Sequence, residues 1–127
     1  VHTPAAAIPT AGKATYNGTA FDKNERGNFT YYVDFAARNG HGNITGLSRF
    51  GDISLARAAL TNGNYLTGKG GSAKGTGIEG EATAASGSRF NYDLVFFGNQ
   101  AEELTGDLYN RSLESIGVHG TRGAISN

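Results

Sequence analysis

Residues 28–35 read Asn-Phe-Thr-Tyr-Tyr-Val-Asp-Phe, and this stretch decides the fold class. Polar and apolar side chains alternate along it, so that one face collects Phe29, Tyr31, Val33 and Phe35. Successive side chains of a β-strand point to opposite faces, and a period of two therefore indicates a strand with one buried face. The aromatic and β-branched residues on that face also favour a strand.

The same alternation recurs along most of the chain, punctuated by Gly and Asn. Residues 89–97 form the second strong example, and weaker ones occupy residues 13–21, 43–48, 65–68, 76–84, 105–109 and 116–121. Each segment with its turn takes roughly a dozen residues, which is typical of all-β sandwiches and barrels. The pattern predicts about eight short antiparallel strands.

Residues 52–60 are compatible with two structures. Asp52 is a suitable helix cap and the apolar residues behind it fall at helical spacing, but the same residues also alternate as in a strand. We favour the strand, because the helix would be very short and the Asn62-Gly63 pair that follows is a hairpin signal. A second Asn-Gly pair predicts a turn over residues 38–42, and residues 101–104 allow one helical turn.

Composition supports an all-β domain. The 127 residues include 20 Gly, 7 Phe and 6 Tyr, with no Cys, Met or Trp. Abundant aromatic residues distinguish this Gly-rich chain from a disordered one. We predict a single small eight-stranded antiparallel up-and-down β-barrel with a filled interior, since closure removes exposed sheet edges. A β-sandwich is the alternative. The barrel is predicted over residues 12–127, after a flexible lead-in over residues 1–11 that holds both prolines.

Charge and motifs argue against several classes of function. Eleven basic and eleven acidic residues give a net charge of zero, which leaves no basic excess for nucleic acid. No apolar run approaches the roughly 18 residues that span a bilayer. Residues 75–80 match Gly-x-Gly-x-x-Gly and residues 63–69 imitate a phosphate loop, but neither is followed by the helix that such loops need. Scattered carboxylates and the lack of a framed serine nucleophile argue against an enzyme.

Five residues are candidates for binding. Arg49 and Phe50 stand at a predicted hairpin tip, and Arg and aromatic residues are common interface anchors, although Phe50 also fits a buried loop position. Tyr32 faces away from the apolar face of its strand and is a third partner-binding candidate. His41 and His119 are candidate haem ligands, with a turn residue and a hydrogen-bonded or solvated strand residue as their plainer roles. The histidine spacing predicts no zinc site.

Several segments together resemble a known bacterial family. The opening residues 12–18 lead into residues 26–35, and residues 58–60 precede the run Asn-Gly-Asn-Tyr-Leu-Thr-Gly at 62–68. The most distinctive segment is Phe-Phe-Gly-Asn-Gln-Ala-Glu-Glu-Leu-Thr-Gly at 96–106, and residues 116–122 close the pattern. In order and spacing these segments resemble the C-terminal barrel shared by transferrin-binding protein B, factor H binding protein and the neisserial heparin-binding antigen. The likeness covers nearly all of the chain after the lead-in, although His119 stands where an aromatic residue is more usual.

The resemblance implies a function by binding and brings no catalytic residue. It implies a non-enzymatic module on the Gram-negative cell surface, lipid-anchored in the outer membrane, or secreted. Such a module engages a host macromolecule in nutrient acquisition or immune evasion. We expect a monomer whose partner is a host protein or a haem-carrying protein. One alternative is a carrier of haem or another small ligand, with haem as its cofactor. Another is the barrel half of a two-domain protein whose handle domain binds the ligand.

Overall fold

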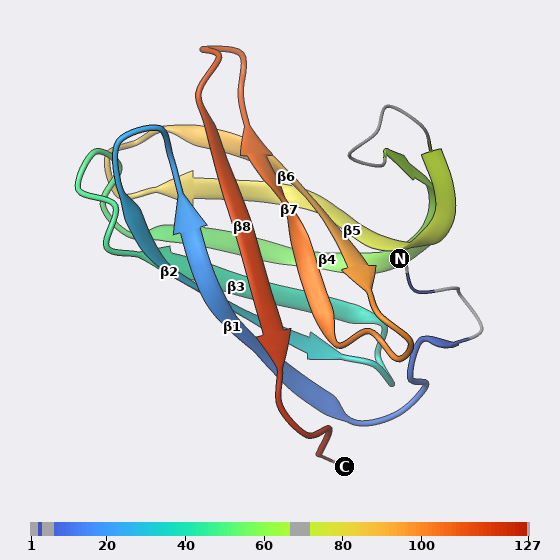
Figure 1. The fold of residues 1–127 in the computed structure, drawn as a ribbon. Helices are drawn as coiled ribbons and strands as arrows, with labels where there is room; N and C mark the ends of the chain where they lie inside the picture. Colours follow the sequence, from blue (N-terminus) through green and yellow to red (C-terminus); the bar gives the residue numbers. More distant parts are fainter. Residues whose placement is uncertain (1–2, 4–6, 67–71, 127) are drawn as a thin grey trace.

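The structure is a computed structural model that describes residues 3, 7–66 and 72–126, without the side chains of 63–66 and 72–74. The strands are β1 (Lys13–Phe21), β2 (Arg26–Asp34), β3 (Asn39–Thr45), β4 (Ile53–Leu66), β5 (Ser72–Ala84), β6 (Arg89–Phe97), β7 (Glu103–Tyr109) and β8 (Ser115–Arg122). Each strand pairs antiparallel with the next, and β8 pairs with β1, so that the sheet closes into a barrel (Figure 1). The predicted eight-stranded antiparallel barrel is confirmed.

The strand prediction for residues 52–60 is also confirmed, because Ile53 begins β4. The predicted turns at the two Asn-Gly pairs are wrong, since residues 39–40 begin β3 and residues 62–63 lie within β4. The β2–β3 turn occupies residues 35–38 instead. Position 40 requires glycine for a steric reason, because a Cβ atom there would collide with the ring of Tyr31. The predicted helical turn at 101–104 is absent, and that segment passes directly into β7.

The inward face of the barrel carries the alternating apolar residues and forms one core. Its largest fully buried side chains are Tyr16, Tyr31, Tyr92, Phe29, Phe35, Phe50, Phe96, Ile44, Leu47, Ile53, Leu55 and Ile78. The rings contact one another, as in the edge-on pair of Tyr31 and Tyr92, whose centroids are 6.0 Å apart. Eight strands enclose a lumen that side chains just fill, and this core occupies it.

Part of the predicted lead-in packs against the barrel. The backbone N–H of Thr3 donates to the carbonyl oxygen of Phe96 at 2.9 Å, and its hydroxyl donates to that of Gly98 at 2.8 Å. Ile8 is only 4% exposed and belongs to the core. Burying an apolar side chain of this size favours a packed segment over a freely moving one. Thr3 and Ile8 of the predicted lead-in therefore pack against the barrel, and the flexibility of residues 1–11 stays a prediction.

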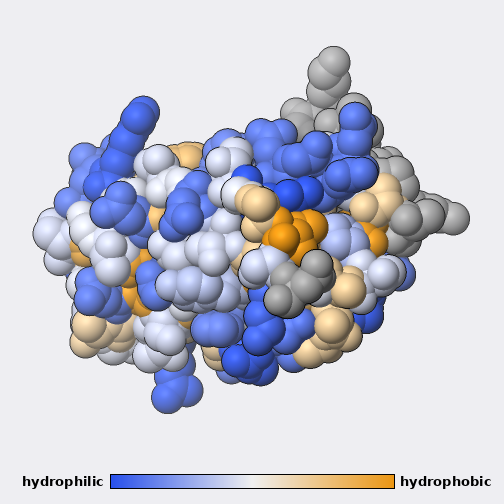
Figure 2. Space-filling view, turned by 90° about the horizontal axis from the view of Figure 1, so that it is seen from below, coloured by the Kyte–Doolittle hydropathy of each residue, from blue (hydrophilic) through white to orange (hydrophobic). Residues whose placement is uncertain are grey.

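The surface is mostly polar. Figure 2 shows a face on which hydrophilic residues predominate and hydrophobic ones form small groups. Four large apolar or aromatic side chains of the described residues are exposed: Phe21, Tyr32, Tyr109 and Leu113. None of the helical segments in the described ranges is long and apolar enough to cross a membrane.

Candidate functional site

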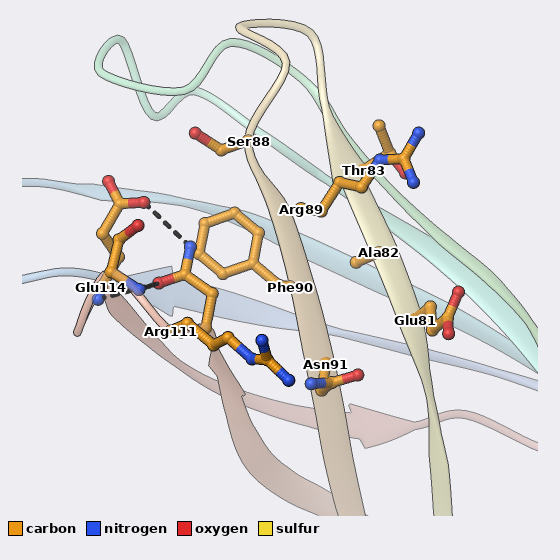
Figure 3. A pocket seen from close by; sticks show the side chains of 11 residues that line it. Glu81, Ala82, Thr83, Ser88, Arg89, Phe90, Asn91, Arg111 and Glu114 are labelled. Carbon is orange, nitrogen blue, oxygen red and sulfur yellow. Dashed lines mark hydrogen bonds between the residues drawn. The ribbon is translucent and has the colours of Figure 1, made fainter.

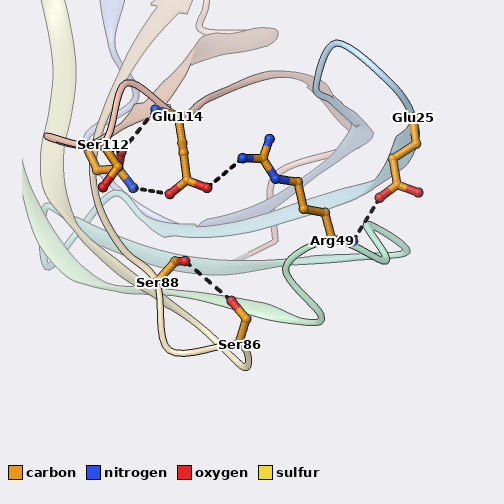
Figure 4. A network of polar contacts seen from close by, with 7 residues as sticks. Glu25, Arg49, Ser86, Ser88, Ser112 and Glu114 are labelled. Carbon is orange, nitrogen blue, oxygen red and sulfur yellow. Dashed lines mark hydrogen bonds and ion pairs between the residues drawn. The ribbon is translucent and has the colours of Figure 1, made fainter.

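The hairpin loops at one end of the barrel are tied together by carboxylates. Glu25 accepts hydrogen bonds from the hydroxyl of Ser48 and the backbone N–H of Arg49, at 3.0 to 3.1 Å. The guanidinium of Arg49 donates to Glu114 at 2.9 Å (Figure 4). These contacts join the β1–β2, β3–β4 and β7–β8 connections into one rim. Arg49 is thus partly exposed, as a partner-binding residue must be, but its guanidinium is already paired with Glu114.

Phe50 does not lie at an exposed tip. It is 2% exposed, and its ring packs edge-on against Phe90 with the centroids 5.3 Å apart. The guanidinium of Arg49 covers the outer side, 4.9 Å from the ring centroid. The buried alternative considered for this residue is therefore the one that the structure adopts, and Phe50 cannot serve as an exposed anchor in this conformation.

An open groove adjoins this rim at Glu114, between the β5–β6 and β7–β8 hairpins (Figure 3). Its walls mix the charges of Glu81, Arg89, Arg111 and Glu114, and its one aromatic residue, Phe90, is only 3% exposed. Interfaces usually centre on accessible aromatic and Arg side chains with few competing charges. This groove is therefore a weaker candidate than the outer wall of β2 to β4.

The candidate histidines lie on the outside of the barrel, on different parts of the wall. His119 on β8 contacts Glu103 on β7, with 3.2 Å between the ring nitrogen and the carboxylate oxygen. Both side chains are 48% exposed. His41 lies on β3 instead of in a turn, so its predicted turn position is wrong. The strands β1 and β2 separate the two histidines, which cannot act together on one ligand.

Tyr32 and His41 form a stacked aromatic pair on the outer wall. They are directly opposite each other in the β2–β3 ladder, and their ring centroids are 5.2 Å apart at an interplanar angle of 30°. Tyr32 is 42% exposed. Residues directly opposite in an antiparallel pair have neighbouring side chains, which explains the contact. Two candidates that the sequence left separate are therefore one feature.

A bulge in β4 brings an arginine beside this pair. Gly40 pairs with Ala58 and Gly42 with Leu55, so that the single residue His41 opposes both Ala56 and Arg57. Such a bulge re-aims side chains and often lies next to binding sites. Arg57 is exposed, and its guanidinium donates to the side-chain oxygen of Asn39 at 2.7 Å.

These residues line one shallow groove on the outer wall, with a volume of about 290 Å³. We call the group Lys13, Tyr32, Asn39, His41 and Arg57 the outer-wall patch. It combines an exposed aromatic surface with two basic side chains and an amide, and Asp34 lines the same groove. Such a set can stack on flat groups and donate hydrogen bonds to anions.

Sequence reasoning found Tyr32 and His41 and missed Arg57. A signal was present, because Arg57 falls in register with the apolar residues Ile53 and Leu55. A charged residue on the inward register of a strand indicates a bulge that turns it outward. The outward pair at positions 56 and 57 is that bulge.

Metal binding finds no support on the described residues. No group of three or more His, Asp or Glu side chains among them is arranged to hold a metal ion. The prediction of haem binding at His41 or His119 is not tested by this geometry and stays a prediction.

Comparisons with known proteins agree with the fold. The family described as "Factor H binding protein, C-terminal" matches residues 6–108. A surface lipoprotein structure superposes with a TM-score of 0.67 at 14% identity, over 95% of this chain and 65% of that one. A mutant of transferrin-binding protein B from Actinobacillus pleuropneumoniae H49 gives 0.66 at 14% identity, over 95% and 66%. A double mutant of the Haemophilus parasuis Hp5 protein gives 0.66 at 17%, over 95% and 27%. The chain thus spans less than two thirds of the length of these structures.

Proposed function

The chain belongs to the family of the factor H binding protein C-terminal domain, and on that basis we propose that it is a non-enzymatic binding module that engages a host protein through its outer-wall patch. We further propose that it acts at a bacterial cell surface or as a secreted protein. Two of the matched structures are a surface lipoprotein and a transferrin-binding protein, which supports this setting.

The observation that carries the proposal is the exposed stack of Tyr32 on His41 beside Arg57. Tyr and Arg are the residues that most often dominate binding energy at protein interfaces. Stacking and the bond to Asn39 restrict these side chains before a partner arrives. Less side-chain freedom is then lost on binding, and such preorganisation raises affinity.

The patch also lies on a rigid wall that the fold leaves accessible. Tyr32 and His41 lie on strands whose opposite faces are core residues such as Tyr31 and Val33, so the exposed rings stand on a fixed base. The interior is filled, and a partner must therefore bind the outer wall or the loops.

The test is capture of a host serum protein on immobilised protein, with Tyr32→Ala as the probe. Tyr109→Ala is the matched control, because Tyr109 is 41% exposed on β7, against 42% for Tyr32 on β2. We expect one protein to be retained by the wild type and by Tyr109→Ala, and lost with Tyr32→Ala. Equal retention by all three variants, or no retained protein, would contradict the proposal.

A further inference from the structure

The charges of this neutral chain are unevenly distributed around the barrel. The strands β1 to β4 carry three basic residues, Lys13, Arg26 and Arg57, and one acidic residue, Asp34. The strands β5 to β8 carry five acidic residues, Glu79, Glu81, Asp93, Glu103 and Asp107, and three basic ones. The barrel therefore has a basic half and an acidic half, although its net charge is zero.

In the acidic half, this uneven distribution places like charges next to one another. Glu79, Asp93 and Asp107 are directly opposite one another across β5, β6 and β7. Like charges in such positions are destabilising. Burial and the neighbouring Asp93 raise the pKa of Asp107 above its usual range. This row of acidic side chains belongs to the half formed by β5 to β8, whereas the residues of the outer-wall patch belong to β1 to β4.

The cations of the patch have no acidic partner among the described residues. Lys13 is directly opposite Asp34 in the β1–β2 ladder, but the two make no ion pair. One Asp34 oxygen accepts the backbone N–H of Ala37 at 3.0 Å instead. Arg57 donates through Nη1 to Asn39, and its Nε and Nη2 make no hydrogen bond within the described residues. Nη1 of Arg57 is thus held by Asn39, while Nε and Nη2 remain available to donate hydrogen bonds to a partner.

We propose that the outer-wall patch binds an acidic segment of its partner protein, with the free N–H groups of Arg57 and the ammonium of Lys13 donating to Asp or Glu carboxylates. Arg presents parallel donors that match a carboxylate, and a fixed guanidinium pairs with less loss of freedom. The rings of Tyr32 and His41 cover apolar atoms beside the carboxylates and exclude water. This inference rests on the proposed function, because it names the chemistry of that same site.

The direct test uses acetylated, amidated penta-glutamate, with penta-lysine as the opposite-charge probe, and backbone amide NMR shifts of the labelled protein. At about 20 mM salt we expect saturable shifts at residues 32, 41 and 57 with penta-glutamate and none with penta-lysine. Arg57→Gln should raise the Kd about tenfold, since a charge-assisted hydrogen bond contributes roughly 1.5 kcal/mol. Arg89→Gln, which removes an exposed Arg from β6 in the acidic half, should leave the Kd within about twofold.

The inference is overturned if penta-glutamate causes no saturable shift at the patch, shifts other regions alone, or acts no differently from penta-lysine. The serum experiment separates this failure from that of the proposed function. Capture of the serum protein could depend on Tyr32 and yet be unchanged in Arg57→Gln and at high salt. That result supports the proposed function and contradicts an acidic partner segment. Patch shifts with penta-glutamate and no captured protein support the carboxylate site and contradict the function.

Discussion

The hydroxyl oxygens of Tyr31 and Tyr92 lie 2.9 Å apart in the core, although the two residues are 61 positions apart in the sequence. The Tyr92 hydroxyl donates to the carbonyl oxygen of Ala56, and the Tyr31 hydroxyl is therefore the donor to Tyr92. Ala56 lies where the β4–β5 ladder shifts register between Leu55 and Leu60. A side chain from β6, two strands away from β4, thus satisfies a backbone oxygen at the bulge.

Tyr92→Phe should destabilise the protein more than Tyr31→Phe. The first change leaves both the Tyr31 hydroxyl and the Ala56 oxygen without this partner, whereas the second removes one hydrogen bond. Because a buried polar group left unpaired costs about 1–3 kcal/mol, we expect losses near 2–3 and near 1 kcal/mol respectively. Urea unfolding of the two variants measures the difference, and an equal loss in both would contradict this arrangement.

Alkaline pH should unfold the barrel through its buried tyrosines. Burial raises the pKa of Tyr16, Tyr31 and Tyr92 above the ordinary value of 10.0. Below pH 10 both states keep these protons, and the stability that the neutral hydroxyls contribute is fully present. Above pH 10 the unfolded chain loses them while the folded one holds them, so the free energy of unfolding falls as pH rises. Absorbance at about 295 nm should show these three of the six tyrosines ionising only together with unfolding. Their ionisation in the folded state would contradict the prediction.

Substitutions of the rim residues Arg49 and Phe50 should differ sharply in their effect on the stability of the protein. Phe50→Ala removes a fully buried ring packed on Phe90 and should cost about 3–5 kcal/mol. Arg49→Ala removes a half-exposed side chain that pairs with Glu114 and should cost about 1 kcal/mol or less. Thermal unfolding of both variants checks this. A large loss with Arg49→Ala would show that the rim network contributes more to stability than its exposure suggests.

Glycine at position 18 should resist substitution. A Cβ atom there would collide with the backbone oxygen of His119 on β8, and neither strand can move without opening the β1–β8 seam. Gly18→Ala should therefore destabilise the protein by about 1–3 kcal/mol. Gly123→Ala is the matched control, because nothing lies within 4 Å of a Cβ atom at that position. Equal melting temperatures of the two variants would argue against a tight seam.

Haem titration tests the alternative of a haem carrier. Because His41 and His119 lie on different parts of the outer wall, with β1 and β2 between them, they cannot ligate one haem together, and we expect no sharp new Soret band on adding haem. The proposed module binds a host protein and does not need haem. A sharp band that disappears with His41→Ala or with His119→Ala would instead favour the carrier.

Much of the fold was predictable from local pattern. The alternation in residues 28–35 and 89–97 identified β2 and β6, and the number and spacing of such segments indicated the closed antiparallel barrel. The outward position of Tyr32 followed from the same period. Both Asn-Gly turns were mispredicted. At position 40 glycine is required by the neighbouring ring of Tyr31 and not by a turn, and the sequence alone does not distinguish these two requirements.

The sequence by itself determined that the chain forms an all-β barrel and that Tyr32 faces solvent, because a period of two is a property of each strand alone. Only the tertiary structure decided that His41 stacks on Tyr32, that Arg57 leaves the inward register to join them, and that Phe50 is buried. Those outcomes depend on strand register and on a bulge in β4. Register and bulges are set by pairing between strands and by packing across the lumen, which no single strand encodes.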